Sequence, residues 1–579
     1  MMLLLLGGCF DELFGPAASE CAAPLPPDGV VVVDATCEGA PTSPSWDLSV
    51  RDRTPLPAFA TELHATRVED VDGDGLITAA DPMQLWVESG LKHLSLHDAD
   101  TTWRAEHVVG AYRATAAVGE LDPTTPGSEI LVAWSEQDPS ERVGREYLTL
   151  GDEGGVFFER ESPSALDNPW LTDLEGDGTI EAIVNGRILD ATTGAWLADL
   201  EGIPQDVYGV NVTADLDRDG VQEIISRRGN AVDLLNADGS LRNTCRARTA
   251  HRSSFMATFA VGNLDGDADG EFVAAGGDFV AVCDTDGTLL TSIELGLSQP
   301  SSVAIGELDG DPEPEIVVVD GPAAYALDHD LTLKWTYTGP NWCWFPLSLV
   351  DLDNDGLHEV LIHVEQDLKV LSPTGVELAV VDLGNTYSSS WMSQPVVADL
   401  DGDGLAEIVV GDDELFVITN ADGGWRVPEA EVGWAGMDHF PGDRAVDGSI
   451  PPASPFWLES NVWNGHPAGP VGTADLGVAV TDVCVDTCEG DAVVTVAVGN
   501  HGVEDLHHAA TVEVWSADGG DLLGTTVLAP SLGSGVSRSV AVTVPADRLA
   551  EGLAARVSTP VAECDLVTNE AEWRGSVCP

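Results

Sequence analysis

The sequence VVADLDGDGLAEIVVGD occupies residues 396–412. Its centre, residues 399–407, follows the pattern D-x-D-x-D-G-x-x-E, and a short run of mostly β-branched residues stands on each side. Such runs, bounded by turn residues, are typical of strands, whereas a helix would need a longer stretch with a period of 3.6 residues. The stretch therefore predicts a strand, an acidic loop and a second strand.

The acidic motif recurs eight times at intervals of 42 to 53 residues. The copies begin at Asp70, Glu120, Asp173, Asp215, Asn263, Glu307, Asp351 and Asp399. Each interval has room for about four short strands, and four-stranded sheets repeated radially make a β-propeller. We predict an all-β chain whose residues 56–430 form a seven- or eight-bladed propeller. The count depends on whether the weak Glu120 motif marks a blade.

The loop pattern places carboxylates at positions one, three, five and nine around a glycine that permits a sharp turn. Ca²⁺ prefers about six to eight oxygen ligands in a tolerant geometry, whereas transition metals favour His or Cys, which do not occupy the predicted ligand positions of these loops. An ordinary turn is the alternative, because Asp and Gly also populate turns without metal. Eight copies favour several structural Ca²⁺ ions. The predicted ligands are Asp70, Asp72, Asp74, Asp81, Asp173, Glu175, Asp177, Glu181, Asp215, Asp217, Asp219, Glu223, Asn263, Asp265, Asp267, Asp269, Glu271, Glu307, Asp309, Asp311, Glu315, Asp351, Asp353, Asp355, Glu359, Asp399, Asp401, Asp403 and Glu407.

The loops are not equivalent in sequence. The loops that begin at Asp215, Asp351 and Asp399 are complete, whereas the Glu120 loop lacks its middle acid. Ala268 and Pro312 stand where the Asn263 and Glu307 loops would have glycine. We expect the Glu120 loop to bind metal weakly or not at all.

The two ends of the chain differ from the repeats. Leu6-Gly7-Gly8-Cys9 predicts a lipoprotein signal, residues 1–9, with lipidation at Cys9. Residues 10–55 are predicted to be a tether and N-terminal segment, and residues 431–472 an irregular connection rich in Gly, Pro and Trp. Residues 473–579 contain about seven segments that alternate apolar and polar residues, which predicts an immunoglobulin-like β-sandwich. We expect the protein in the cell envelope, as an outer-membrane lipoprotein, or on the cell surface or outside the cell. The remaining cysteines predict disulfides there, with the pairing open.

Composition limits the partners. The chain of 579 residues has 98 acidic and 25 basic residues, a net charge of −73. This charge excludes nucleic acids and anionic membrane surfaces as electrostatic partners, because both need patches of Lys and Arg. No HExxH, GxSxG, P-loop or Rossmann glycine pattern occurs, so we expect no enzymatic activity.

VAIGELDGD at residues 303–311 and VVADLDGDGLAEIVVGD at 396–412 resemble the FG-GAP/VCBS repeat family, which includes the head of integrin α chains. The resemblance covers roughly residues 60–430. It implies a propeller with mostly structural Ca²⁺ in the loops of one face and with ligand binding elsewhere on the surface. The segments from residue 475 onward, with ECDLVTNEAEW near the end, resemble the CARDB domain, an immunoglobulin-like module related to cell adhesion.

The expected function is therefore a calcium-stabilised, lipid-anchored surface protein that recognises a protein or glycan. A secreted propeller enzyme acting on polysaccharide, such as a lyase, and a purely structural envelope protein remain the alternatives.

Overall fold

The computed structural model describes most of the chain between residues 25 and 574. Outside the described part lie residues 1–24, 34–45, 68–76, 98–102, 109–112, 122–126, 136–144, 151–155, 163–168, 204–210, 247–257, 340–346, 385–392, 435–439, 469–474, 486–489, 560–568 and 575–579, and stretches of one to three residues elsewhere. The chain divides into two compact units. Unit 1 is Met1–Glu38 with Gly472–Pro579, and unit 2 is Gly39–Val471.

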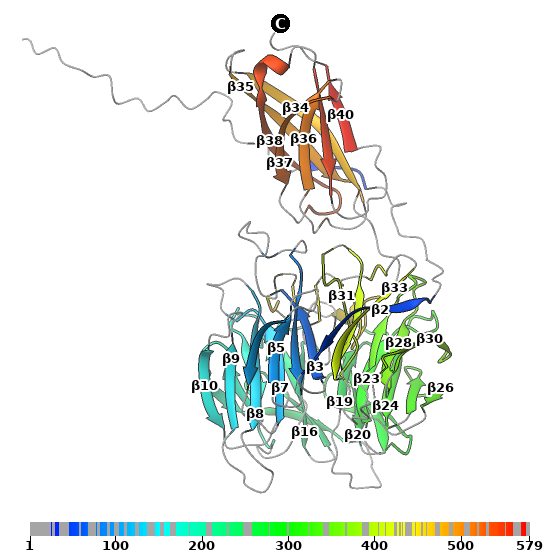
Figure 1. Ribbon diagram of the computed structural model, residues 1–579. Helices are drawn as coiled ribbons and strands as arrows, with labels where there is room; N and C mark the ends of the chain where they lie inside the picture. Colours follow the sequence, from blue (N-terminus) through cyan, green and yellow to red (C-terminus); the bar gives the residue numbers. More distant parts are fainter. Residues whose placement is uncertain are drawn as a thin grey trace, which may run out of the picture. The chain divides into compact units, whose positions relative to one another are not determined.

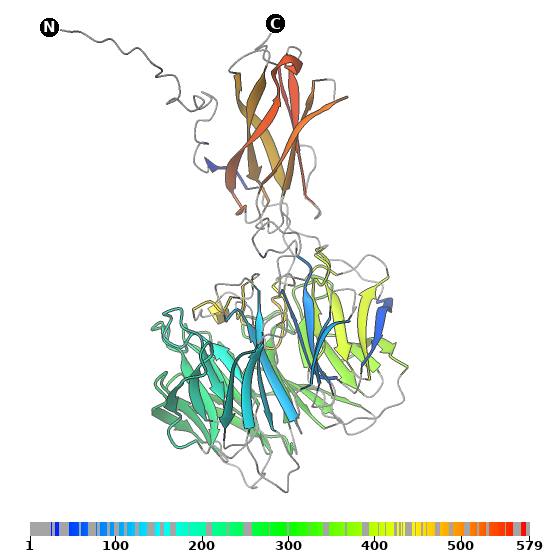
Figure 2. The same ribbon diagram turned by 60° about the vertical axis from the view of Figure 1, so that its left-hand side comes forward.

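Unit 2 is a β-propeller. Its described residues form eight four-stranded antiparallel sheets, which follow one another around an axis in chain order (Figures 1 and 2). We number these sheets as blades 1 to 8. The number agrees with the eight acidic motifs, the weak motif at Glu120 included.

The strands are given from the first to the fourth of each blade. Blade 1 contains β3 (Ala60–Thr66), β4 (Gln84–Ser89), β5 (His93–His97) and β6 (Trp103–Val108); blade 2 contains β7 (Arg113–Gly119), β8 (Glu129–Ser135), β9 (Arg145–Leu150) and β10 (Val156–Ser162). Blade 3 contains β11 (Trp170–Thr172), β12 (Glu181–Val184), β13 (Arg187–Asp190) and β14 (Trp196–Asp199); blade 4 contains β15 (Asn211–Ala214), β16 (Glu223–Arg228), β17 (Ala231–Leu235) and β18 (Leu241–Cys245). Blade 5 contains β19 (Thr258–Gly262), β20 (Glu271–Gly276), β21 (Phe279–Cys283) and β22 (Leu289–Glu294); blade 6 contains β23 (Pro300–Gly306), β24 (Glu315–Asp320), β25 (Ala323–Leu327) and β26 (Leu333–Thr338). Blade 7 contains β27 (Leu347–Val350), β28 (Glu359–Val364), β29 (Asp367–Leu371) and β30 (Glu377–Asp382); blade 8 contains β31 (Val396–Ala398), β32 (Glu407–Gly411), β33 (Glu414–Asn420) and β2 (Leu48–Pro55).

The burial of the strands explains their sequences. The second strand of a blade is packed on both faces, so β24 and β28 are buried along their whole length and consist largely of Val, Ile and Leu. The fourth strand lies at the outside, and β22 alternates half-buried and exposed residues.

The last blade is completed by the beginning of the chain. β2 pairs with β33 in antiparallel register, Leu48 opposite Asn420 and Pro55 opposite Glu414. Blades 1 and 8 also share one core, in which Ala60 and Leu85 pack with Val396 and Val417. The N-terminal segment, predicted with residues 10–55 as a tether, therefore contributes a strand that closes the ring.

Each blade has a β-bulge at the start of its outermost strand. In blade 4, Leu234 pairs with Asn243 but Leu235 pairs with Leu241, so Arg242 has no partner in the ladder. The corresponding shift recurs in the other seven blades. The residues at the bulges are Arg104, Phe157, Leu197, Arg242, Leu290, Lys334, Leu378 and Arg51, from blade 1 to blade 8. A bulge redirects the side chain it carries.

Residues 425–466, which we call the inner segment, pack against the first strands of the blades. Trp434 forms a bridge with Ala65 of β3, and Trp463 forms one with Ile305 of β23. The side chain of Arg444 donates to the carbonyl of Val118 in β7. Further contacts reach Trp170 of β11, Asn263 after β19, Leu349 of β27 and Val397 of β31. The segment predicted as a connection, residues 431–472, is thus largely part of the propeller core, and a short 3₁₀ helix, η1 (Phe456–Leu458), lies within it.

Aromatic stacking anchors the inner segment. The ring of Trp463 is fully buried and stacks on Phe440 and Trp170, with centroid distances of 5.0 Å and 6.1 Å. Phe440 also stacks on Phe456, at 4.5 Å. Such pairs add about 0.5–1.5 kcal/mol beyond the area they bury.

Unit 1 consists of two four-stranded sheets. One contains β1 (Gly29–Val30), β38 (Val536–Pro545), β35 (Asp491–Asn500) and β34 (Leu476–Val485); the other contains β37 (Leu522–Leu528), β36 (Ala510–Ser516), β39 (Leu553–Ser558) and β40 (Glu570–Trp573). A 3₁₀ helix, η2 (Ala546–Arg548), follows β38. Valines of both sheets share one core, which fits the predicted sandwich. β1 falls in the predicted tether but pairs with β38.

One disulfide, Cys245–Cys283, joins β18 of blade 4 to β21 of blade 5. Cys484 is also disulfide-bonded. Both observations agree with the disulfides predicted from the sequence. In the described part of the chain, no helix is long and apolar enough to cross a membrane.

We expect the substitution Trp463→Ala to destabilise unit 2 by about 3–5 kcal/mol, because it removes a fully buried indole and leaves a cavity. Chemical denaturation followed by circular dichroism measures the loss. Leu458→Ala in the same segment is the control, because Leu458 is 49% exposed and its loss should cost at most about 0.5 kcal/mol. Equal stabilities of the two variants would show that the inner segment does not hold the propeller together.

Candidate metal centres in the acidic loops

Each acidic loop connects the first and second strands of its blade. In an antiparallel sheet, the turn between the third and fourth strands lies at the same end as this loop. Carboxylates of both connections meet in blade 6, where Asp328, which follows β25, joins Asp311 and Glu315 in one cluster. Acidic side chains therefore concentrate at one end of each blade.

A buried glutamate marks the end of every described loop. One of its oxygens accepts a hydrogen bond from the backbone N–H of the leucine at loop position two, over 2.6–3.1 Å in seven blades. These glutamates are at most 4% exposed. They are Glu129, Glu181, Glu223, Glu271, Glu315, Glu359 and Glu407. Glu129, in the Glu120 loop, was not among the predicted residues because it stands one residue later than the pattern requires.

The aspartate at position one shapes its own loop. The two oxygens of Asp351 accept from the backbone N–H groups of Asp355 and Gly356, at 3.1 Å and 2.8 Å. Asp173 and Asp215 accept from the equivalent positions. Each carboxylate oxygen keeps a further lone pair, so the same residue remains available to a cation.

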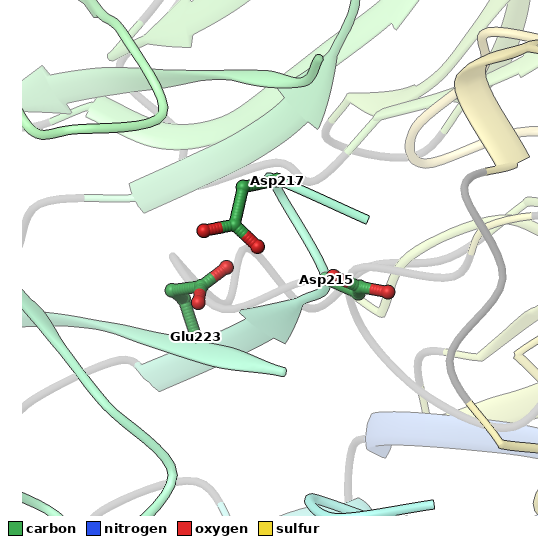
Figure 3. A group of neighbouring side chains, drawn as sticks. All are labelled: Asp215, Asp217 and Glu223. Atoms are coloured by element: carbon green, nitrogen blue, oxygen red, sulfur yellow. The ribbon is translucent and has the colours of Figure 1, made fainter. Parts of the chain in front are cut away.

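Five groups of carboxylates have oxygens within 4.8 Å of one another, and a further group exists among the described residues. The five are Asp215–Asp217–Glu223, Asp265–Asp267–Glu271, Glu307–Asp309–Glu315, Asp311–Glu315–Asp328 and Asp351–Asp353–Asp355. Figure 3 shows the first of them, in which the carboxylates of Asp217 and Glu223 face each other beside Asp215. Oxygen-only donor sets of this kind fit a hard divalent cation such as Ca²⁺.

Without a bound metal ion the loop glutamates hold their protons tightly. Burial, reinforced by neighbouring aspartates, raises the pKa of Glu359 to about 9 and that of Glu271 to about 8. Burial also raises the pKa of Glu181 to about 7. It raises the pKa of Glu223 and Glu315 to about 7 and that of Glu407 to about 8, although a neighbouring Arg or Lys lowers each of these three values. The charged form of these side chains therefore needs a positive partner.

Among the described residues, three loops have such a partner within the chain. Arg242 pairs with Glu223 and Asp217, both at 2.5 Å. Lys334 pairs with Glu315 and Asp309, and Arg51 pairs with Glu407 at 2.8 Å and with Asp401 at 3.0 Å. Sequence reasoning missed all three cations. A signal existed for two of them, since Arg242 and Lys334 each stand nineteen residues after their loop glutamate.

The remaining predicted site residues, the lipidation site Cys9 included, divide into four groups. Cys9, Asp70, Asp72, Asp74 and Asp403 lie outside the described residues, so their roles stay predictions. Asp81 is buried, and its backbone carbonyl accepts from Arg67. Asp177 and Asp219 accept from N–H groups within their own loops, and Asp269 pairs with Arg218 at 3.3 Å. Glu175 and Asp399 stay candidate ligands of their loops.

Comparison with known proteins supports the fold. No protein-family model and no curated protein matches the chain, so the FG-GAP/VCBS and CARDB resemblances stay predictions. Among solved structures, the V. cholerae biofilm matrix protein Bap1 is 14% identical, with a TM-score of 0.55 over 75% of this chain and 100% of that chain. BBS1N in complex with ARL6DN is 11% identical, with a TM-score of 0.38 over 65% of this chain and 98% of that chain. The WD40 domain of Neurospora crassa Pan2 is 9% identical, with a TM-score of 0.35 over 67% of this chain and 100% of that chain.

The raised glutamate pKa values predict how stability depends on pH. A carboxyl group whose pKa is higher in the folded state contributes stability below its unfolded pKa, and this contribution is lost as the pH rises through the folded pKa. For Glu271 and Glu359 the loss extends from about pH 4.5 to pH 8–9. We expect the metal-free protein to melt at a lower temperature at pH 8.5 than at pH 5.5. Added Ca²⁺ should reduce this difference, because it binds the deprotonated form.

The substitution Glu359→Gln tests whether the ionisation of this glutamate causes the pH dependence of the melting temperature. The amide oxygen can still accept from Leu352 N–H, but the side chain cannot ionise. In metal-free protein at pH 8.5, the variant should melt at or above the temperature of the wild type, and with Ca²⁺ it should gain less. Glu294→Gln, on an exposed strand position, is the control. A melting temperature of the metal-free wild type that rises with pH would contradict the burial argument.

Proposed function

We propose that this protein is a calcium-stabilised binding protein of the cell surface or extracellular matrix. Its propeller recognises a protein or glycan partner, Ca²⁺ ions hold its loops, and a lipid on Cys9 attaches it to the outer membrane. The observation that carries the proposal is the Asp351 loop. There, three clustered carboxylates stand beside Glu359, which is 1% exposed and whose pKa burial raises to about 9.

A divalent cation is the simplest partner for such a loop. The oxygens of Asp351, Asp353 and Asp355 would hold the ion, together with the second oxygen of Glu359. The ion supplies positive charge that allows all four groups to ionise without mutual repulsion. The chain's own part is to fix the loop, through the Asp351 and Glu359 hydrogen bonds to backbone N–H groups.

The charge of the chain limits what the propeller binds. With a net charge of −73, a neutral glycan or a positively charged protein surface suits it better than a polyanion. An acidic polysaccharide would need Ca²⁺ as a bridge. The similarity to the V. cholerae biofilm matrix protein Bap1 supports a role in adhesion or in a matrix.

Attachment of the producing cells to a surface tests this function. We expect deletion of the gene to reduce attachment, and Ca²⁺ withdrawal to do the same. Replacement of Asp351, Asp353 and Asp355 by Asn should give an intermediate loss, because one loop of several is affected. The purified protein should leave alginate, a polyuronate, at its original length. Shortening of the polymer with new double bonds would favour the lyase alternative, and unchanged attachment after deletion would contradict adhesion.

The lipid anchor is tested separately. We expect Cys9→Ser to move the full-length protein from the membrane fraction to the soluble fraction, because no lipid can then be attached to residue 9. Immunoblotting of the two fractions measures the change. A variant that stays with the membrane would show that Cys9 is not the anchor.

A further inference from the structure

The residue at the bulge of the outermost strand is positively charged in some blades and apolar in the others. Four blades carry a cation there, Arg104, Arg242, Lys334 and Arg51, and four carry an apolar residue, Phe157, Leu197, Leu290 and Leu378. From blade 3 to blade 8 the two kinds alternate. The side chains of Arg104 and Phe157 lie outside the described residues, so the argument uses the other six.

In blades 4, 6 and 8 the cation at the bulge contacts two carboxylates of its own blade, and these stand at equivalent loop positions in all three blades. Arg242, Lys334 and Arg51 each contact the acid at loop position three and the buried glutamate at position nine. Three different fourth strands, one of them from the beginning of the chain, make this contact. Because three separate segments make the same contact with the acidic loop, the contact follows from the shared geometry of the blades.

In blades 3, 5 and 7 a leucine occupies the bulge. Leu197 and Leu290 are 53% and 45% exposed, and Leu378 packs against the core shared by blades 7 and 8. Among the described residues, no Lys or Arg forms an ion pair with Glu181, Glu271 or Glu359. These loops have the same buried glutamate but no cation from the bulge.

We propose that the bulged residue decides how each acidic loop is neutralised. Arg242, Lys334 and Arg51 are built-in counter-ions that take the place of a divalent ion in blades 4, 6 and 8. The loops of blades 3, 5 and 7 depend on a bound divalent cation. This inference rests on the proposed calcium role for the second group, and it departs from the sequence prediction for the first, which included the complete loops at Asp215 and Asp399.

Two physical reasons make the partners mutually exclusive. The guanidinium or ammonium group uses the oxygens of positions three and nine that the ion would need, and Ca²⁺ requires about six to eight oxygens. A divalent ion placed among these carboxylates would also lie close to the cation, and like charges at a few ångströms repel strongly where solvent is limited. Because side-chain and metal counter-ions alternate around the ring, three of these six blades keep their counter-ion when Ca²⁺ is scarce.

Exchange of the bulged residues tests the proposal. Bound Ca²⁺ is counted by mass spectrometry in the purified full-length protein after dialysis against Ca²⁺. We expect Arg242→Leu to gain about one ion per chain, because it frees the complete loop at Asp215 for metal. Leu378→Arg should lose about one ion, because it places a cation beside Glu359. Arg242→Lys and Leu378→Met are matched controls that should keep the wild-type count.

Circular dichroism establishes that each variant is folded before its bound Ca²⁺ is counted. If Leu378→Arg does not fold, Arg51→Leu gives a second test, because it should gain about one Ca²⁺ in blade 8. A metal-binding wild type whose count does not change with Arg242→Leu or Arg51→Leu would overturn the inference and leave the calcium role standing. A wild type that binds no Ca²⁺ at all would overturn both.

Discussion

The acidic loops of the propeller depend on a buried glutamate whose charged form needs a positive partner. In each described loop, a glutamate at the start of the second strand accepts a hydrogen bond from the leucine N–H at position two. This bond fixes the loop against the blade, but it also places a charge where water cannot solvate it. A side-chain cation or a bound ion then determines whether the loop is stable, and in this way links the local fold to the ionic conditions of the solution.

The other constraint is closure of the ring. β2 completes blade 8, and the inner segment contacts the first strands of seven blades. Trp463 and Asn464 lie among these strands and bind their backbone. The inner segment thus lies along the edge of the first strands that is not paired within the blades. The propeller is thus held by contacts between distant parts of the chain as well as by loop cations.

The sequence predicted the features that are local. Runs such as EIVVVD after an acidic loop identified the second strands, and the motif spacing predicted seven or eight sheets, of which the described residues form eight. Closure by β2, the packing of the inner segment and the pairing of β1 with β38 could not be predicted, because they depend on contacts between residues far apart in the chain. The clusters Asp215–Asp217–Glu223 and Asp351–Asp353–Asp355 consist of residues that the sequence singled out, and their metal role stays a prediction. The side-chain cations were missed because Arg242 and Lys334 reach the loops only through a register shift.

The most direct test of the account is a crystal structure of the protein grown with a lanthanide in place of Ca²⁺, in which anomalous scattering locates each ion. The account predicts anomalous peaks in the loops that begin at Asp173, Asn263 and Asp351, and none in the loops that contain the contacts of Arg242, Lys334 and Arg51. An absence of peaks from all six loops would contradict the metal role. Peaks in all six would contradict the division between side-chain and metal counter-ions.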